Sequence, residues 1–179
     1  MRAGVSDLGH SPDELLASFR AAMRHVAATV YAVTTGHGGG RFGILATAVS
    51  SLSFEPPSLL VCVNRAASLH APLAEAQMFC VNILGLANRD VAEHFMNGAS
   101  PDRFAVGDWM EVEGLPVLAT AQSSLVCRTA HRHDFGTHSI FIGELIAAKH
   151  RTDATPLTYF DRNYIDISAA PERGKAGAA

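Results

Sequence analysis

The chain has 179 residues, a length that suits one domain with a substantial core. Apolar residues make up 48% and charged residues only 17%, which excludes a disordered chain and suggests that a second subunit covers part of the surface. The formal net charge is −3 and no lysine- or arginine-rich run occurs, which argues against nucleic acid or an anionic membrane as the main partner. Because no apolar stretch reaches the ~18 residues of a membrane helix and the chain starts without a hydrophobic signal core, we expect a cytoplasmic protein.

The first predicted element is an amphipathic helix over residues 11–26. Ser11, Pro12 and Glu14 form a capping box with proline at the first helical position. Burial of one large apolar side chain contributes roughly 1.5–3 kcal/mol, so we expect this helix to dock on another surface. Its apolar stripe consists of Leu15, Leu16, Phe19, Ala22, Met23 and Val26.

The residue pattern after this helix mainly favours β-strands. Many strands, few helices and no regular βαβ alternation predict an antiparallel barrel or sandwich with peripheral helices. We expect one domain over residues 1–168, followed by a flexible C-terminal tail over residues 169–179. Strands are predicted at 29–35, 44–50, 58–64, 78–84, 124–132, 137–148, 157–160 and 164–167, and helices at 68–77 and 86–97.

A glycine cluster over residues 38–43 matches the dinucleotide fingerprint G-x-G-x-x-G in form only. That motif needs a helix after it, so that the helix N-terminus faces a pyrophosphate. Residues 44–50 favour a strand instead, and no acidic residue lies about 20 positions further on. The glycines therefore predict a loose hairpin with positive φ angles.

A polar stretch follows, in which four hydroxyl side chains fall within residues 47–53. Hydroxyls donate to phosphate oxygens and small side chains let backbone N–H groups approach, so the stretch fits anion recognition; it also fits a polar strand edge that breaks into a turn. The next strand ends in Asn64 and Arg65, and Ser68 is placed to cap a helix at 70–76. These two neighbouring polar loops indicate a phosphate site.

Histidines offer a further candidate site. His138 stands before an apolar strand, where it either faces a cleft or supports the structure. His131 and His133 alternate on one strand face, but no third ligand is near them, so we predict no metal site.

The three cysteines lie far apart in apolar runs, which indicates buried thiols in a reducing compartment. Two strands carry the same tripeptide, Cys-Val-Asn, ending at Asn64 and at Asn82, and this repetition indicates similar strand environments. No nucleophile–base pair stands out along the chain. This pattern fits a protein whose chemistry belongs to a bound cofactor.

Six blocks in chain order resemble the flavin reductase-like domain family. Each block is weak alone, but their order is specific, and the resemblance runs from about Phe19 to Ile167. It implies an FMN-binding split β-barrel, usually a homodimer with the flavin near the subunit interface. It also implies hydride transfer from NADH or NADPH to FMN or FAD, often for a separate monooxygenase. The blocks are residues 43–57, 61–68, 79–82, 102–104, 136–144 and 156–160.

The resemblance also assigns expected roles to single residues. By this carry-over, His138 lies near the nicotinamide, Tyr164 closes the same pocket, and Asn82 is a weaker candidate with a structural alternative. Ala66 and Ala67 replace residues that are often more polar in the family, which loosens the expected phosphate grip. The isoalloxazine and ribityl chain would be lined by Thr47, Ala48 and Val49, and the ribityl and phosphate groups by Ser50, Ser51, Asn64, Arg65 and Ser68.

Two other functions are compatible with the same residues. One is a flavoprotein that keeps FMN permanently and reduces an organic substrate. The other is a non-catalytic module that binds flavin or haem.

Overall fold

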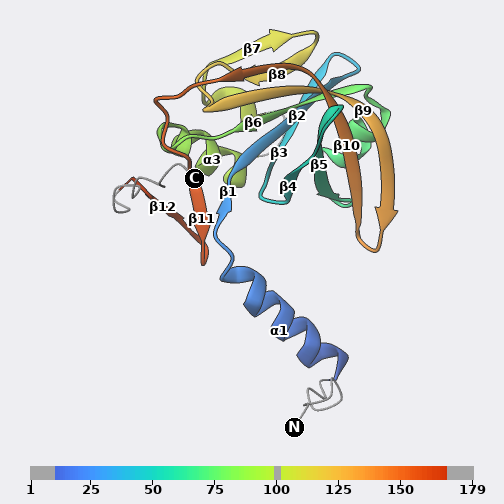
Figure 1. Cartoon of the computed structure of the whole chain (residues 1–179), viewed down its shortest axis with the longest axis vertical. Helices are drawn as coiled ribbons and strands as arrows, with labels where there is room; N and C mark the ends of the chain where they lie inside the picture. The colour runs from blue at the N-terminus through green and yellow to red at the C-terminus, as the bar shows by residue number, and fades with distance from the viewer. Residues whose placement is uncertain (1–10, 99–101, 169–179) are drawn as a thin grey trace, which may run out of the picture.

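The computed structural model describes residues 11–98 and 102–168 of the chain. Most of the strands form one curved antiparallel sheet, which makes the body of the molecule in Figure 1. Its two edge strands follow one another in the chain but do not pair with each other, so the barrel stays open along one side. The predicted antiparallel split barrel with peripheral helices is confirmed. The sheet order is β3 (Gly40–Ala46), β2 (Tyr31–His37), β6 (Met78–Ile83), β9 (Ser123–Phe135), β10 (His138–His150), β5 (Pro57–Asn64) and β4 (Val49–Phe54).

Smaller elements cover the ends of this sheet. The hairpin of β7 and β8 was not predicted from the sequence, and the predicted tail over residues 169–179 lies outside the described residues. The remaining elements are β1 (Ala28–Thr29), β7 (Trp109–Val112), β8 (Leu115–Leu118), β11 (Thr158–Phe160), β12 (Asn163–Ile165), α1 (Pro12–Arg24), α2 (His70–Glu75), α3 (Arg89–Asn97) and the 3₁₀ turns Leu86–Asn88 and Asp102–Ala105.

Helix α1 begins as its sequence predicts. The Ser11 Oγ accepts a hydrogen bond from the Glu14 N–H (3.3 Å), and the Glu14 carboxylate accepts one from the Ser11 N–H (2.8 Å). None of its side chains is buried, and Figure 1 shows the helix projecting away from the sheet. The surface on which it was expected to dock is therefore not found in the described part of the chain. No helix within residues 11–98 and 102–168 is long and apolar enough to cross a membrane.

The glycine cluster makes the predicted hairpin. Strand β2 pairs with β3 up to the His37–Gly40 pair, and the turn residues Gly38 and Gly39 have φ angles of 56° and 76°. Side chains disfavour this left-handed region, which explains the glycines without any phosphate-binding role.

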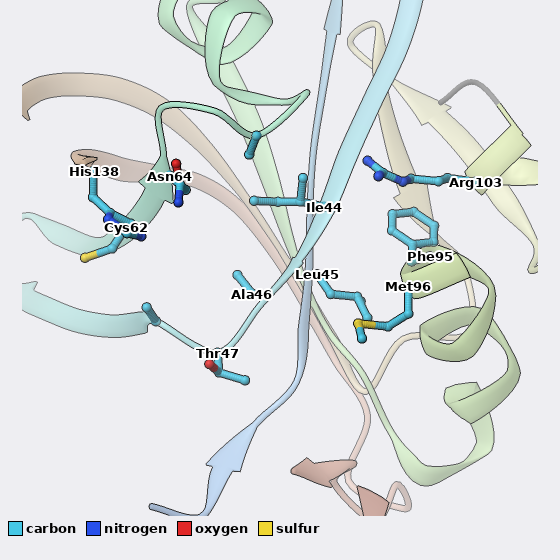
Figure 2. A pocket seen from close by; sticks show the side chains of 12 residues that line it. Ile44, Leu45, Ala46, Thr47, Cys62, Asn64, Phe95, Met96, Arg103 and His138 are labelled. Carbon is cyan, nitrogen blue, oxygen red and sulfur yellow. The ribbon is translucent and has the colours of Figure 1, made fainter. Parts of the chain in front are cut away.

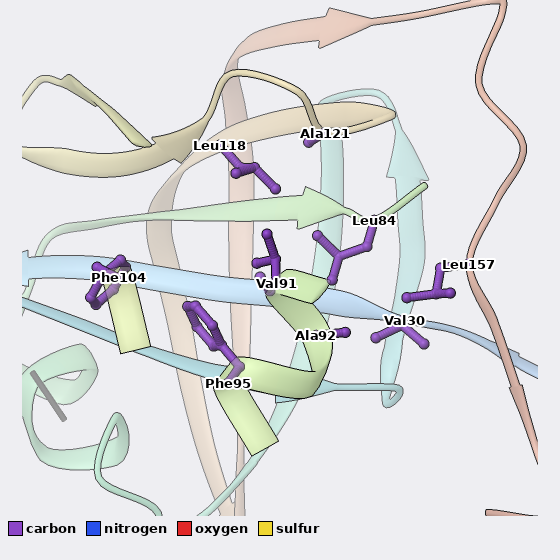
Figure 3. Packing of buried hydrophobic residues seen from close by; sticks show 10 residues of the cluster. Val30, Leu84, Val91, Ala92, Phe95, Phe104, Leu118, Ala121 and Leu157 are labelled. Carbon is purple, nitrogen blue, oxygen red and sulfur yellow. The ribbon is translucent and has the colours of Figure 1, made fainter. Parts of the chain in front are cut away.

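Two apolar clusters hold the sheet and its helices together. One fills the interior of the open barrel, where Phe79 and Phe141 are fully buried with Leu73 of α2 and its N-cap Leu69. The other lies between the sheet and α3, where Figure 3 shows Phe95 and Phe104 facing one another. The Phe95 ring centroid is 5.5 Å from those of Phe104 and Trp109. The second cluster fixes α3 beside the edge strand β3.

The cysteines are only partly as predicted. Cys80 and Cys127 are fully buried, and burial raises the pKa of both thiols to about 12. Cys62 is only half-buried and faces a cleft, so for this residue the prediction of a buried thiol is wrong.

The bend of β10 depends on Gly143, where the register with β9 shifts. A Cβ at this position would lie 2.5 Å from the Phe79 Cζ and 2.7 Å from the Cys127 Cβ. We expect Gly143→Ala to lower the free energy of unfolding by about 1–3 kcal/mol, measured by urea denaturation. In a Phe79→Leu background the same change should cost less, because the crowding ring is gone. An unchanged urea midpoint for the single variant would contradict this account of the bend.

Candidate functional site

A cleft of about 370 Å³ lies where the sheet fails to close. Strand β3 ends at Ala46 and β4 begins at Val49, so Thr47 and Ala48 alone carry the chain across the split. These two residues lie outside both strand registers, so their backbone groups, apart from the Ala48 carbonyl, can face a ligand. Figure 2 shows side chains from β3, β5, α3 and the start of β10 converging on this space. The lining is Ile44, Leu45, Ala46, Thr47, Ala48, Cys62, Asn64, Ala67, Phe95, Met96, Arg103 and His138.

The structure brings four of the residues proposed from the sequence into this cleft. Thr47 and Ala48 form the crossing, and the carbonyl of Ala48 accepts a hydrogen bond from the Cys62 N–H (2.9 Å). Asn64 and His138 are direct partners in the β5–β10 ladder, so one residue from each strand faces the same opening. Segments far apart in the sequence therefore meet here.

Other proposed residues lie elsewhere. Val49, Ser50 and Ser51 line a separate hollow of about 380 Å³. Arg65 is exposed in the turn after β5, where its backbone N–H donates to the Thr137 carbonyl (2.9 Å). Tyr164 lines a smaller hollow that adjoins the cleft.

Asn82 lines neither the cleft nor the two other hollows. It is fully buried, its amide nitrogen donates to the Ala32 carbonyl (3.1 Å), and its amide oxygen accepts from the Leu118 N–H (2.9 Å) and the Ser124 hydroxyl (3.2 Å). The expectation that Asn64 and Asn82 share similar environments is wrong, because Asn64 ends its strand in the open and Asn82 lies beneath β8. The structural alternative accounts for Asn82, and we do not propose it as a flavin ligand.

Ser68 reaches the cleft through Arg103. The Arg103 Nη1 donates to the Ser68 Oγ (2.8 Å) and to the Gly43 carbonyl (2.8 Å), while its Nε donates to the Gly98 carbonyl (3.0 Å). Ser68 does not cap α2, whose N-cap is Leu69, so that part of the prediction is wrong. Because its oxygen accepts from Arg103, the Ser68 hydroxyl proton is available to donate to an anion.

A polar network joins the start of α2 to β9 and β10. The Ser139 hydroxyl donates to the Asp134 carboxylate (2.6 Å), so the His70 Nε2, 2.7 Å from the same oxygen, must be the donor in that second bond. Arg132 binds Asp134 through two nitrogens, each at 2.8 Å. This network ties the first residue of α2 to β10.

Burial of His70 and the Arg132 guanidinium lower pKa values in this network, while the Asp134 charge acts against them on His70. Burial lowers the pKa of His70, and the Arg132 guanidinium adds to that effect. The hydrogen bond from Arg132 lowers the pKa of Asp134. The His70–Ser139 bond requires a proton on Nε2, and the lowered pKa of His70 favours the neutral tautomer that carries it.

His138 has one partner of its own. Its Nδ1 lies 2.9 Å from the Thr137 Oγ1, which orients the exposed ring at the mouth of the cleft. Figure 2 shows the ring beside Asn64 and Cys62.

Sequence reasoning missed part of this site. Arg103, Phe95 and Met96 line the cleft, although none was proposed as a site residue. Arg103 belongs to the block 102–104 that carried the family resemblance, so that block was the available signal. Phe95 and Met96 lie on α3, and nothing local in their sequence distinguishes a cleft wall from an ordinary apolar helix face.

The open antiparallel barrel, with a cleft of about 370 Å³ at its split, defines the chain as a split-barrel protein. A family model described as "Flavin reductase like domain" matches residues 23–168, and the chain belongs to this family.

Named relatives agree with this assignment. FMN reductase (NADH) RutF 1 of Methylorubrum extorquens is 42% identical over 167 residues, covering 90% of this chain and 82% of the relative. The NADH:FAD oxidoreductase SgcE6 of Streptomyces globisporus, solved with NAD and FAD fragments, superposes with a TM-score of 0.82 at 28% identity, covering 92% of this chain and 98% of that one. BorF, the flavin reductase component of a bacterial two-component tryptophan halogenase, gives a TM-score of 0.77 at 28% identity, covering 84% and 97%.

Arg103 is expected to hold the cleft in shape. Lysine has a single nitrogen and cannot reach all three oxygens that Arg103 binds. We expect Arg103→Lys to lower the free energy of unfolding by about 1–3 kcal/mol, measured by urea denaturation. The matched control is Arg151→Lys, which alters an exposed pair with Asp153 and should stay within about 0.5 kcal/mol of the parent. Equal losses in the two variants would contradict this role.

Proposed function

We propose that this protein is a cytoplasmic NADH-dependent flavin reductase that passes a hydride to FMN or FAD and supplies the reduced flavin to a separate monooxygenase. The observation that carries the proposal is the cleft at the split, whose lining combines apolar side chains with a few polar ones (Figure 2). The names of the relatives, which specify NADH, FMN and FAD, support it.

The residues present fit a flavin. Ile44, Leu45 and Phe95 give the cleft an apolar wall suited to the benzenoid part of an isoalloxazine ring. Polar groups border this wall on two sides, with Arg103 beside Phe95 and Asn64 across the cleft (Figure 2). Through Arg103 the lining also includes the free hydroxyl proton of Ser68. A ring with a polar edge and a phosphorylated tail matches this combination of apolar and polar groups.

The protein's part in the reaction is to bind and orient. A bound flavin supplies the ring that accepts the hydride, and NADH supplies the hydride itself. No side-chain base is needed at the reacting atoms, because holding them about 3–3.5 Å apart can lower the barrier by several kcal/mol. The backbone at Thr47 and Ala48 lies where it can donate to a polar ring edge. His138, oriented by Thr137, borders the side from which a nicotinamide would approach.

We propose NADH rather than NADPH as the donor. A 2′-phosphate would need a cation of its own. Within the described part of the chain, the cleft lining contains one arginine, Arg103, and it already donates to three protein oxygens.

The deciding assay follows oxidation of NADH and NADPH with riboflavin, FMN or FAD added in turn. A flavin reductase oxidises NADH at a rate that scales with added free flavin. A yellow protein that reduces only its own bound FMN would favour the flavoprotein with an organic substrate. No oxidation of either nucleotide would favour the non-catalytic flavin- or haem-binding module and overturn the proposal.

His138 is proposed to act on the nicotinamide side. We expect His138→Ala to lower kcat/KM for NADH on the order of 10-fold through lost positioning, with flavin affinity by fluorescence quenching largely retained. The control is His133→Ala, an exposed histidine of β9 outside the cleft lining, which should match the parent. Equal losses in NADH turnover and flavin binding would contradict the assignment.

We further propose that the protein is a homodimer. A helix of 13 residues is marginal in water by itself, and its stability comes from packing of its apolar face. Leu15 and Phe19 in α1 are both 61% exposed, and Met23 is 51% exposed, so this face has no cover in the described part of the chain. A second copy of the chain would cover it, and the low charged fraction supports such a contact.

Oligomeric state can be tested on that face. We expect the parent to sediment as a dimer and Phe19→Glu as a monomer, because a charge in a desolvated apolar contact costs several kcal/mol. Ala21→Glu adds the same charge on the opposite face of α1 and should leave the dimer intact. A monomeric parent, or a dimeric Phe19→Glu variant, would refute the proposed contact.

A further inference from the structure

A second, smaller hollow adjoins the cleft. It has a volume of about 180 Å³ and is lined by Val30, Leu45, Ala46, Thr47, Met96, Tyr159 and Tyr164. Leu45, Ala46, Thr47 and Met96 line the cleft as well, so the two spaces share a wall. Figure 2 shows Leu45 and Met96 side by side, with Thr47 further along the same edge. We call this hollow the tyrosine slot.

Two tyrosine rings, paired across a hairpin, form the aromatic part of the tyrosine slot. Tyr159 and Tyr164 are a directly paired couple in the β11–β12 hairpin, and their ring centroids lie 5.6 Å apart at 63°. Both rings are only half-buried, so part of their surface remains free to contact a ligand.

The tyrosine slot is uncharged. None of its lining side chains carries a charge, and burial raises the pKa of the Tyr164 hydroxyl, which keeps that group a neutral donor. The Arg89 guanidinium lies over the Tyr164 ring, with its carbon 5.9 Å from the centroid, and forms no part of the lining. An anionic group would gain little here, whereas a flat neutral ring with polar edges would gain both stacking and hydrogen bonds.

We propose that the tyrosine slot binds the adenine ring of a dinucleotide whose other half occupies the cleft. This inference rests on the proposed function, since both FAD and NADH carry adenine. Stacking on tyrosine suits a purine, and the flexible thioether of Met96, 64% exposed, can close over it. The hydroxyls of Thr47 and Tyr164 are available at the edges of the slot.

Direct binding of AMP by isothermal titration calorimetry is the first test. The parent should bind AMP, Tyr164→Leu should bind it about 10-fold more weakly through lost stacking, and Tyr164→Phe should keep most of the affinity. Tyr31→Leu is the matched control, because Tyr31 is the only other tyrosine and lines neither the slot nor the cleft. Failure of the parent to bind AMP, or equal weakening by Tyr31→Leu, would overturn the inference.

Kinetics then identify which adenine is bound. If the slot takes FAD, Tyr164→Leu should lower the ratio of kcat/KM for FAD to that for FMN by about 10-fold. If the slot takes NADH, the same variant should lower kcat/KM for NADH relative to kcat/KM for reduced nicotinamide mononucleotide, which lacks the adenine. FMN is the acceptor in both assays. Both ratios unchanged would refute the slot and point to cover by the second subunit instead.

These tests separate the inference from the proposed function. Absence of NADH oxidation by the parent with every flavin would remove the reductase, while the AMP titration would still report on the tyrosine slot. Normal reductase activity with no AMP binding would remove the slot alone.

Discussion

The unpaired edges of β3 and β4 determine the layout of everything around the cleft. An edge strand presents backbone groups that need partners, and proteins usually cover or pair them. Here the chain crosses between the two edges through Thr47 and Ala48 alone, and α3 is packed beside the β3 edge. A closed barrel of the same strands would have no opening at this place. The cleft is therefore a direct result of the missing pairing.

Local signals predicted the elements that depend on local physics. The cap of α1 and the hairpin at Gly38 and Gly39 follow from a few adjacent residues, and both were found where expected. The β7–β8 hairpin was missed because each strand has only four residues, too few for an alternation to stand out. Its turn is made by Glu113 and Gly114, both with positive φ, and glutamate gives no warning of that conformation.

Some of the residues proposed for the site line one cleft because they are near in the chain. Thr47, Ala48 and Asn64 belong to consecutive segments, and the structure places them together. Asn82 ends the same tripeptide as Asn64, but only the topology of the whole sheet decides that one is open and the other covered. Arg103 acts on groups 35 and 60 positions away, and no local pattern encodes contacts of that range. Its contacts follow from tertiary structure, and the sequence pointed to the residue only through the family block 102–104.

The placement of the three thiols determines which of them can be oxidised by the by-products of flavin reduction. Reduced flavin exposed to dioxygen yields hydrogen peroxide, and thiolates rather than thiols are the species it oxidises. Cys80 and Cys127, buried and protonated far above neutral pH, are sheltered from this attack. Cys62 alone among the three stands where the oxidant would form, at the wall of the cleft. Oxidative damage during storage or turnover should therefore begin at Cys62 in the cleft and spare the two thiols in the interior of the barrel.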